Sequence, residues 1–216
     1  MSAPSTAGGR ATPGTGKRGD RESGLLLVGG MAAIMWVLEV IDQIAGGRLD
    51  SAGIEPRDAD GLDGIVFAPF LHAGFDHLIG NTIPFLLLGF AVALGGIARV
   101  IIVTAVVAVV GGLGTWLVAP ANTVHIGASG IVFGYAAYLV ARGAFSRSVG
   151  QILLGVVVLV VWGATLLQGL VPETGISWQG HLFGAIGGVL AARLLHRRAD
   201  RAADAGRPAV PELSGI

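Results

Sequence analysis

Long apolar runs separated by short polar segments cover most of the chain. Roughly 20 residues of helix, at about 1.5 Å each, cross the hydrocarbon layer of a bilayer. The pattern predicts six membrane-spanning helices, over residues 24–44, 75–94, 100–118, 127–141, 149–171 and 180–196. The fourth run is short by membrane standards, so we expect that helix to begin below the membrane surface or to lie in a thinned bilayer.

The polar segments divide the chain further. Residues 1–23 are rich in Gly, Ser, Thr and Pro, which predicts a disordered cytoplasmic tail, and they lack the apolar core of a removable signal peptide. The membrane domain then covers residues 24–196, and residues 197–216 form a second, basic cytoplasmic tail. The acidic loop 46–73 contains an apolar stretch, residues 65–71, that is too short to span. We expect this stretch to lie in the interface or to re-enter the membrane.

Composition places the chain in a membrane. It is 53% hydrophobic and 13% charged, whereas a soluble domain carries roughly 25% charged residues. The formal net charge of zero gives no case for nucleic-acid binding, and the lack of cysteine excludes thiol chemistry, disulfides and cysteine-bound zinc. Most of the 36 glycines lie inside apolar runs, which favours close helix–helix contact. We therefore expect an all-α membrane protein.

The distribution of basic residues predicts the orientation. Six spans place both termini on one side, and short cytoplasmic segments are enriched in Lys and Arg. With both termini cytoplasmic, the cytoplasmic segments hold 12 of the 14 basic residues: Arg10, Lys17, Arg18, Arg21, Arg99, Arg142, Arg147, Arg193, Arg197, Arg198, Arg201 and Arg207. The outer loops keep only Arg48 and Arg57. We expect a multi-pass protein of the cell membrane.

Three spans carry polar side chains at the end that this orientation places near the outer face. The second span has His77 and Asn81, which share one helix face because they are four residues apart. Ser129 lies in the first turn of the fourth span and His181 in the first turn of the sixth. Polar groups inside a span are costly and usually face a cavity or a partner.

Two of these spans also carry small residues at regular spacing. They are Gly127, Gly130 and Gly134 in the fourth span, and Gly180, Gly184 and Gly188 in the sixth. Such stripes let helix backbones pack closely. If the two stripes meet, Ser129 and His181 lie at the same depth, and the imidazole can take the serine proton. The alternative is that the glycines only pack helices and the polar groups only bond each other.

The polar motifs resemble those of the rhomboid intramembrane serine proteases. The motifs are Gly127-Ala128-Ser129-Gly130, the later His181-Leu182-Phe183-Gly184-Ala185, and the earlier His72 with His77-Leu78-Ile79-Gly80-Asn81. The resemblance runs from about His72 to Gly188. It implies a six-helix rhomboid-like bundle in which Ser129 is the nucleophile and His181 the general base. The implied oxyanion hole combines the Ser129 backbone N–H with His77 and Asn81, and His72 takes the outer histidine position.

The chain departs from the family pattern at three places, and one of them is Pro84 in the second span. The Trp-Arg pair that the family commonly has in the first outer loop is absent, which affects the expected loop conformation. Phe133 stands where relatives often have tyrosine, and we expect its ring to pack against His181. We expect Gly127, Gly130 and Gly184 to shape the same site. Asp76 adjoins His77 in sequence but points elsewhere on a helix.

The leading hypothesis is a serine endopeptidase that cleaves single-span client proteins in or beside their membrane segments, without a metal or another cofactor. Residues 172–179 would form a lid over the site. One alternative is a rhomboid-like protein that binds membrane clients without cutting them. A polytopic transporter with a histidine proton path is another, and a zinc site of His72, His77, His125 and His181 is a third. For His125 we favour packing in its loop over a catalytic role.

Overall fold

The computed structural model describes residues 13–205, and in that range the chain forms helices and no strands. The long helices are α1 (Pro13–Ala45), α3 (Phe75–Ala93), α4 (Ile97–Val118), α5 (Ser129–Ser146), α6 (Val149–Gln168) and α7 (Trp178–Ala205). The loop between α1 and α3 holds a short helix, α2 (Gly64–Phe67), and three 3₁₀ turns: η1 (Leu49–Ala52), η2 (Asp60–Leu62) and η3 (Ala68–Phe70). The prediction of an all-α fold is confirmed.

The predictions for the two tails are partly wrong. Helix α1 begins at Pro13, so residues 13–23 are helical where we expected disorder. Helix α7 continues to Ala205, nine residues past the predicted end at His196. Apolar periodicity marks only the part of a helix that meets lipid or core, and Arg and Ala continue a helix into water at little cost. Residues 1–12 and 206–216 of the two tails lie outside the described range.

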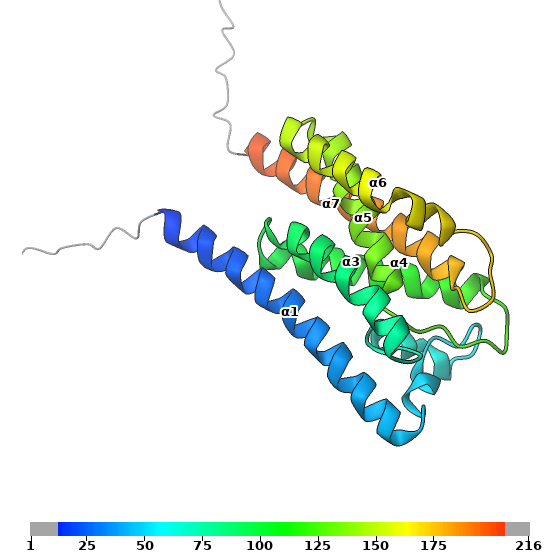
Figure 1. The fold of residues 1–216 in the computed structure, drawn as a ribbon. Coiled ribbons are helices and arrows are strands. Elements are labelled where there is room, and N and C mark those ends of the chain that lie inside the picture. Colours follow the sequence, from blue (N-terminus) through cyan, green and yellow to red (C-terminus); the bar gives the residue numbers. More distant parts are fainter. Residues whose placement is uncertain (1–12, 206–216) are drawn as a thin grey trace, which may run out of the picture.

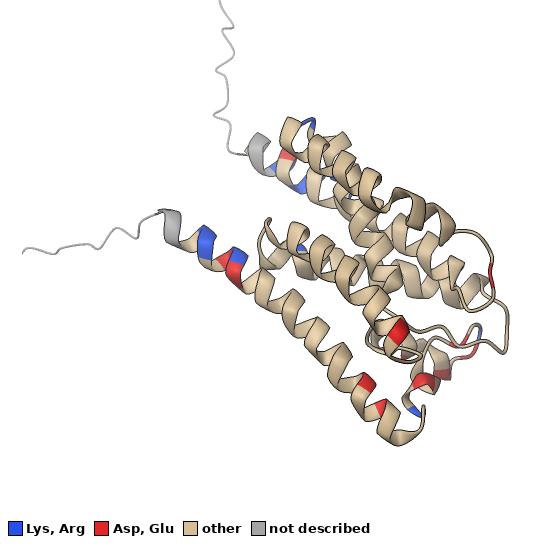
Figure 2. Ribbon diagram, viewed as in Figure 1, with Lys and Arg blue, Asp and Glu red and all other residues tan. Residues whose placement is uncertain are grey.

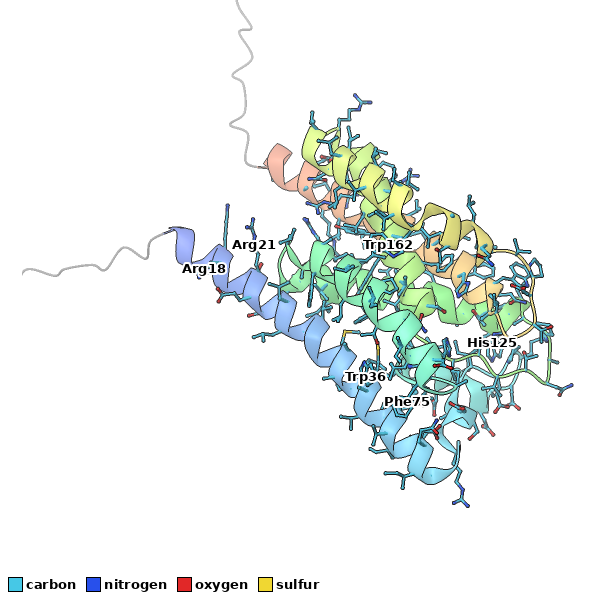
Figure 3. All side chains as sticks on the ribbon, viewed as in Figure 1. Arg18, Arg21, Trp36, Phe75, His125 and Trp162 are labelled. Atoms are coloured by element: carbon cyan, nitrogen blue, oxygen red, sulfur yellow. The ribbon has the colours of Figure 1, made fainter. Side chains whose placement is uncertain are left out.

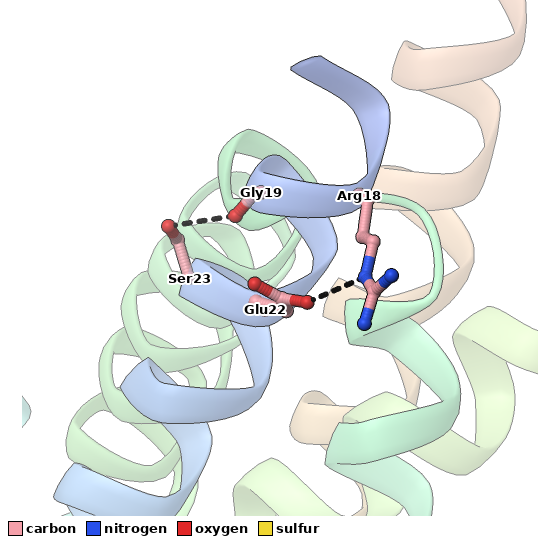
Figure 4. A network of polar contacts seen from close by, with 4 residues as sticks. All are labelled: Arg18, Gly19, Glu22 and Ser23. Atoms are coloured by element: carbon pink, nitrogen blue, oxygen red, sulfur yellow. Dashed lines mark hydrogen bonds and ion pairs between the residues drawn. The ribbon is translucent and has the colours of Figure 1, made fainter. Parts of the chain in front are cut away.

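The first part of α1 makes polar contacts within the helix and with α4. Within the helix, the Arg18 side chain donates to Glu22 at 3.0 Å, and the Ser23 hydroxyl donates to the carbonyl of Gly19 at 2.9 Å (Figure 4). The ion pair is exposed and adds little stability. A tertiary contact is more informative, because Asp20 Oδ1 accepts the backbone N–H of Ile97 at 3.3 Å. Asp20 thereby caps the first turn of α4 from another segment.

In the part of the chain that the structure describes, four helices are long and apolar enough to cross a bilayer: α1 from Gly16, α3, α4 and α6. Helices α5 and α7 are less apolar, because glycines interrupt both and residues such as Arg142 and Gln179 lie within them. Their place in the fold explains this composition. Helix α5 packs against α3, α4, α6 and α7, so it is enclosed by protein on most sides.

The long helices form one bundle with two different ends (Figure 1). We call the end formed by loops 46–74, 119–128 and 169–177 the serine end, since Ser129 lies there. The arginine end is formed by the start of α1, the turns at 94–96 and 147–148, and the end of α7. Figure 2 shows most basic residues at the arginine end and acidic residues gathered at the serine end.

The core lies around the middle of α5. Tyr135 is fully buried, its ring lies 5.8 Å from that of Phe85, and its hydroxyl bonds Thr104 Oγ1 at 2.6 Å. At the edge of the bundle, Trp36 of α1 and Phe75 of α3 lie side by side with ring centroids 6.2 Å apart (Figure 3). Helix α5 therefore lies at the centre of the core, and α1 packs against α3 at the edge of the bundle.

Candidate active site

Glycine contacts between α5 and α7 set the geometry of the site. A Cβ added at Gly184 would collide with the carbonyl oxygen of Gly130, and one added at Gly188 would collide with the carbonyl of Gly134. The two backbones touch at successive turns, as the paired glycine stripes predict. This close contact brings the first turn of α7 beside the first turn of α5 at the serine end.

The contact between Ser129 and His181, predicted from the sequence, is present. His181 Nε2 lies 2.8 Å from Ser129 Oγ, which is hydrogen-bonding distance. His181 is 8% exposed, and Ser129 is half-buried. The arrangement suits a serine hydroxyl that donates to a neutral imidazole.

A backbone carbonyl fixes the histidine tautomer. His181 Nδ1 lies 2.7 Å from the carbonyl oxygen of Gly169, at the end of α6. A carbonyl oxygen can only accept, so Nδ1 carries the hydrogen and Nε2 is free to accept from Ser129. The site therefore orients its histidine without a carboxylate. No residue type could have predicted this contact, because every residue has a backbone carbonyl.

Phe133 holds the other side of the imidazole. Its ring stacks on that of His181, with centroids 4.1 Å apart and planes inclined by 4°. The expected packing of these rings is confirmed. A Cβ at Gly169 would lie 2.6 Å from Phe133 Cζ and 3.0 Å from His181 Nδ1, so a larger residue there would shift one of the two rings. Stacking and the Gly169 carbonyl together restrict how far the imidazole can turn.

His77 and Asn81 face the glycine two residues before the serine. A Cβ at Gly127 would lie 2.8 Å from His77 Nε2 and 3.5 Å from Asn81 Nδ2. Gly127 also has φ of +112°, a backbone conformation that favours glycine. Asn81 Nδ2 is buried and has no hydrogen-bond partner among residues 13–205. Two potential donors therefore converge on Gly127, two residues before Ser129, and the Asn81 amide is unsatisfied among the described residues.

His72 supports the backbone that leads into α5. Its Nε2 accepts the Ala128 N–H at 3.3 Å, and its side chain is 1% exposed. Burial, followed by the nearby His77, lowers the pKa of His72 to about 4. His72 is therefore neutral near pH 7 and able to accept. Gly127 N–H is held in turn by the carbonyl of Ala68 at 2.8 Å.

His125 joins two loops at the serine end, where Figure 3 labels it. Its Nε2 lies 2.9 Å from Thr123 Oγ1, and its Nδ1 lies 2.7 Å from Ser177 Oγ. The Thr123 hydroxyl already donates to the Pro120 carbonyl, so it accepts from Nε2, and Nδ1 accepts from Ser177. Burial lowers the pKa of His125, which favours this neutral form. His125 packs in its loop, as expected. The sequence analysis did not identify its partner Ser177, which lies just before α7.

The remaining site predictions are placed as follows. Gly130 and Gly184 lie in the α5–α7 contact, and Asp76 is exposed. No group of three His, Cys, Asp or Glu side chains within residues 13–205 is placed to hold a metal ion, so the geometry gives the zinc alternative no support. A cavity of about 50 Å³ opens beside Ser129, between the α2–η3 segment, α4 and the start of α7.

Comparison with known proteins identifies the family. Residues 60–198, more than half of the chain, match the Rhomboid domain. The chain belongs to the rhomboid family. Members of this family are intramembrane serine proteases, and the motif resemblance noted in the sequence is confirmed.

Mycobacterial and Bacillus proteins are similar to this rhomboid. Uncharacterized protein Rv1337 of Mycobacterium tuberculosis is 49% identical over 172 residues, which are 76% of this chain and 71% of the relative. Uncharacterized protein ML1171 of Mycobacterium leprae is 46% identical over 183 residues, 78% of this chain and 72% of the relative. "Putative rhomboid protease YdcA" of Bacillus subtilis is 34% identical over 135 residues, 61% of this chain and 66% of the relative.

Proposed function

We propose that this rhomboid is an intramembrane serine endopeptidase with a Ser129–His181 dyad. The observation that carries the proposal is the 2.8 Å contact between Ser129 Oγ and His181 Nε2, with Nδ1 held by the Gly169 carbonyl. Serine is a weak nucleophile unless a base is adjacent. A packing role for the glycines alone would not require this tautomer or the stacked Phe133.

The reaction begins when Ser129 Oγ attacks a peptide carbonyl and His181 Nε2 takes the hydroxyl proton. The imidazolium that forms is stabilised by the Gly169 carbonyl, where many serine hydrolases use a carboxylate. His181 then protonates the leaving amine, which departs and leaves an acyl-enzyme. Water attacks the ester with His181 again as base, and the acid product leaves Ser129 free.

The oxyanion of each tetrahedral intermediate needs donors already in place. Asn81 Nδ2 is buried without a partner in the described part of the chain, which is the state expected of a donor reserved for substrate. His77 shares its face of α3 and approaches Gly127 alongside Asn81. The Ser129 backbone N–H completes the set, because N–H groups in the first turn of a helix have no acceptor within the helix.

The substrate follows from the surroundings of the dyad. We propose that all six long helices cross the bilayer, with both termini cytoplasmic and the serine end outside. Client proteins with one membrane span would then reach Ser129 from the bilayer. The cavity of about 50 Å³ beside Ser129 suits a small side chain next to the scissile bond, because one water needs roughly 10–15 Å³ by this measure.

Labelling with a fluorophosphonate, which reacts with activated serines, tests the nucleophile without a known client. We expect the wild type to be labelled and Ser129→Ala to remain unlabelled. Ser148→Ala, which changes a serine at the arginine end, should be labelled like the wild type. His181→Ala should react at least ~10²-fold more slowly, as expected on loss of a general base. Equal labelling of the wild type and Ser129→Ala would refute the proposal.

Proteolysis of a reconstituted substrate with one membrane span tests the activity itself. Asn81→Ala should lower kcat about 10²-fold, as loss of an oxyanion donor does. Thr82→Val, the next residue on α3, is its matched control. A wild type that is labelled at Ser129 but cuts no peptide bond would favour the client-binding alternative.

The natural absence of cysteine allows a clean test of orientation. A single Asn122→Cys at the serine end should react with a membrane-impermeant maleimide in intact cells. Ser148→Cys at the arginine end should react only after the cells are opened. The reverse pattern would contradict the proposed orientation and leave the dyad chemistry untouched.

A further inference from the structure

A second polar cavity lies at the arginine end, far along the bundle from Ser129. Its volume is about 140 Å³, roughly ten times what one water molecule requires. Four helices contribute to its wall: α4 with Arg99, α5 with Arg142, α6 with Gln151 and α7 with His196. Tyr138, which is 1% exposed, adds a hydroxyl.

The charges in this cavity are unbalanced. Arg99 and Arg142 are both half-buried and close enough to repel each other. Among the side chains that the structure describes, which leave out residues 202–204, neither guanidinium forms an ion pair. The Asp200 carboxylate lies instead 3.4 Å from His196 Nε2. Two like charges partly removed from water are unfavourable unless an anion lies between them. The cavity therefore has the charge and the space for an anion.

The Gln151 side chain points to the same conclusion. Its Oε1 is buried and has no hydrogen-bond partner among the described residues. The two ends of an amide are nearly indistinguishable in shape, so a half-turn presents the NH₂ group to the cavity instead. The Gln151 NH₂ group could then donate a further hydrogen bond to an oxyanion bound in the cavity. Arginine suits such a ligand better than lysine, because its planar fork can donate two parallel hydrogen bonds to phosphate.

The position of the cavity favours a lipid. Arg99 is the third residue of α4 and Gln151 the third of α6, so both lie where helices leave the hydrocarbon. Apart from Ser146, the rest of the wall is apolar and suits the glycerol and upper acyl chain of an amphiphile: Phe145, Ala192, Leu195 and Ala199. Basic pockets between membrane helices on the cytoplasmic side are typical sites for anionic headgroups.

We propose that this cavity binds the phosphate group of an anionic phospholipid through Arg99 and Arg142. The lipid neutralises the two guanidinium groups and joins the ends of α4, α5, α6 and α7. Inorganic phosphate offers the same oxygen atoms but no acyl chains to fill the apolar wall. The proposal is independent of the chemistry at Ser129, and it holds whether or not the chain cuts peptide bonds.

Native mass spectrometry of the full chain, released from detergent, tests the proposal. Phosphatidylglycerol and phosphatidylcholine with identical acyl chains are added in equal amounts. We expect one phosphatidylglycerol to be retained with at least a tenfold preference. The double variant Arg99→Gln/Arg142→Gln should lose this preference. The control Arg193→Gln/Arg197→Gln removes two exposed arginines from the same end of the bundle and should keep it.

A preference that survives in Arg99→Gln/Arg142→Gln, or is lost equally in the control, would overturn the assigned site. Thermal unfolding of the wild type gives a reading that needs no variant. Phosphatidylglycerol should raise Tm in a saturable way, whereas phosphatidylcholine and inorganic phosphate should not. An equal rise in Tm with inorganic phosphate would contradict the proposal that the phosphate group belongs to a lipid. Single Arg99→Gln and Arg142→Gln variants should each lose part of the preference.

Discussion

Helices α5 and α7 touch backbone to backbone, whereas α6 packs mainly against one neighbour. Gly184 and Gly188 of α7 press on carbonyls of α5. In α6 only Gly155 and Val158 are buried, and its main contacts are with α5. Much of its apolar surface is exposed, including Val160 at 79%. Close contact requires small residues, and a lipid-facing surface requires bulky apolar ones.

The difference teaches how the dyad is built. The serine and its base come from the tightly packed pair, so their separation is set by backbone contacts that cannot vary much. The carbonyl that orients His181 comes from the end of α6, at Gly169. The site therefore depends on a rigid interface for distance and on a lightly packed helix for the histidine tautomer.

We expect the largest effect from a substitution that disturbs the rigid α5–α7 interface. Gly184→Ala places a methyl group against the carbonyl of Gly130 and should cost roughly 1–3 kcal/mol of stability. Activity should fall about 10²-fold, because a displacement near 1 Å is enough for such a loss. Gly163→Ala in α6 meets no atom within 4 Å and should be neutral or stabilising by about 0.5–1 kcal/mol. Similar Tm values for the two variants would contradict the comparison.

The next effect concerns pH and the anchor of α5. The pKa of His72 is about 4 in the folded protein and near 6.5 when unfolded, so between these values the unfolded chain binds more protons. The contribution of neutral His72 to the free energy of unfolding is complete above about pH 6.5 and is lost as pH falls toward 4. At pH 5 the loss amounts to about 2 kcal/mol. His72→Gln keeps an acceptor for the Ala128 N–H without titrating. Its Tm should therefore fall less than that of the wild type between pH 7 and pH 5, and parallel curves would exclude this role.

A smaller effect tests the contribution of α6. Gly169→Ala adds a methyl group against Phe133 and near His181 Nδ1, while its own backbone conformation suits alanine. Activity should fall about tenfold, below the 10²–10⁴ that loss of general-base catalysis costs. Tm should change little. Gly150→Ala, near the other end of α6, is the matched control. Equal activities of the two variants would show that a methyl group at position 169 does not displace the His181 imidazole.

The smallest effect concerns the link between loops. His125→Gln cannot bond both Thr123 and Ser177 as the imidazole does, so the start of α7 is held less firmly. We expect a two- to fivefold loss of activity, corresponding to about one net hydrogen bond. Val124→Ala, on the same loop, should leave activity unchanged. A loss of 10²-fold or more would instead place His125 in the chemistry.

The sequence predicted the parts of this protein whose physical cause is local. Apolar runs of sufficient length predicted the helices, and the spans over 75–94 and 149–171 agree with α3 and α6 within three residues. Glycine stripes predicted the α5–α7 contact, because small residues at helical spacing have few other uses in a membrane. The motifs predicted the family. The roles of Ser129, His181, His77 and Asn81 remain predictions that the proposed experiments test.

Tertiary structure alone decided the contacts that have no residue signature. The Gly169 carbonyl that sets the His181 tautomer could be any carbonyl in the chain, so only the approach of α6 to α7 selects it. The contact of Asp20 with the first turn of α4 joins two distant segments, and the Arg99–Arg142 cavity exists because four helix ends converge. Local patterns fix which segments are helical and apolar, whereas the partners of a polar atom depend on segments distant in sequence.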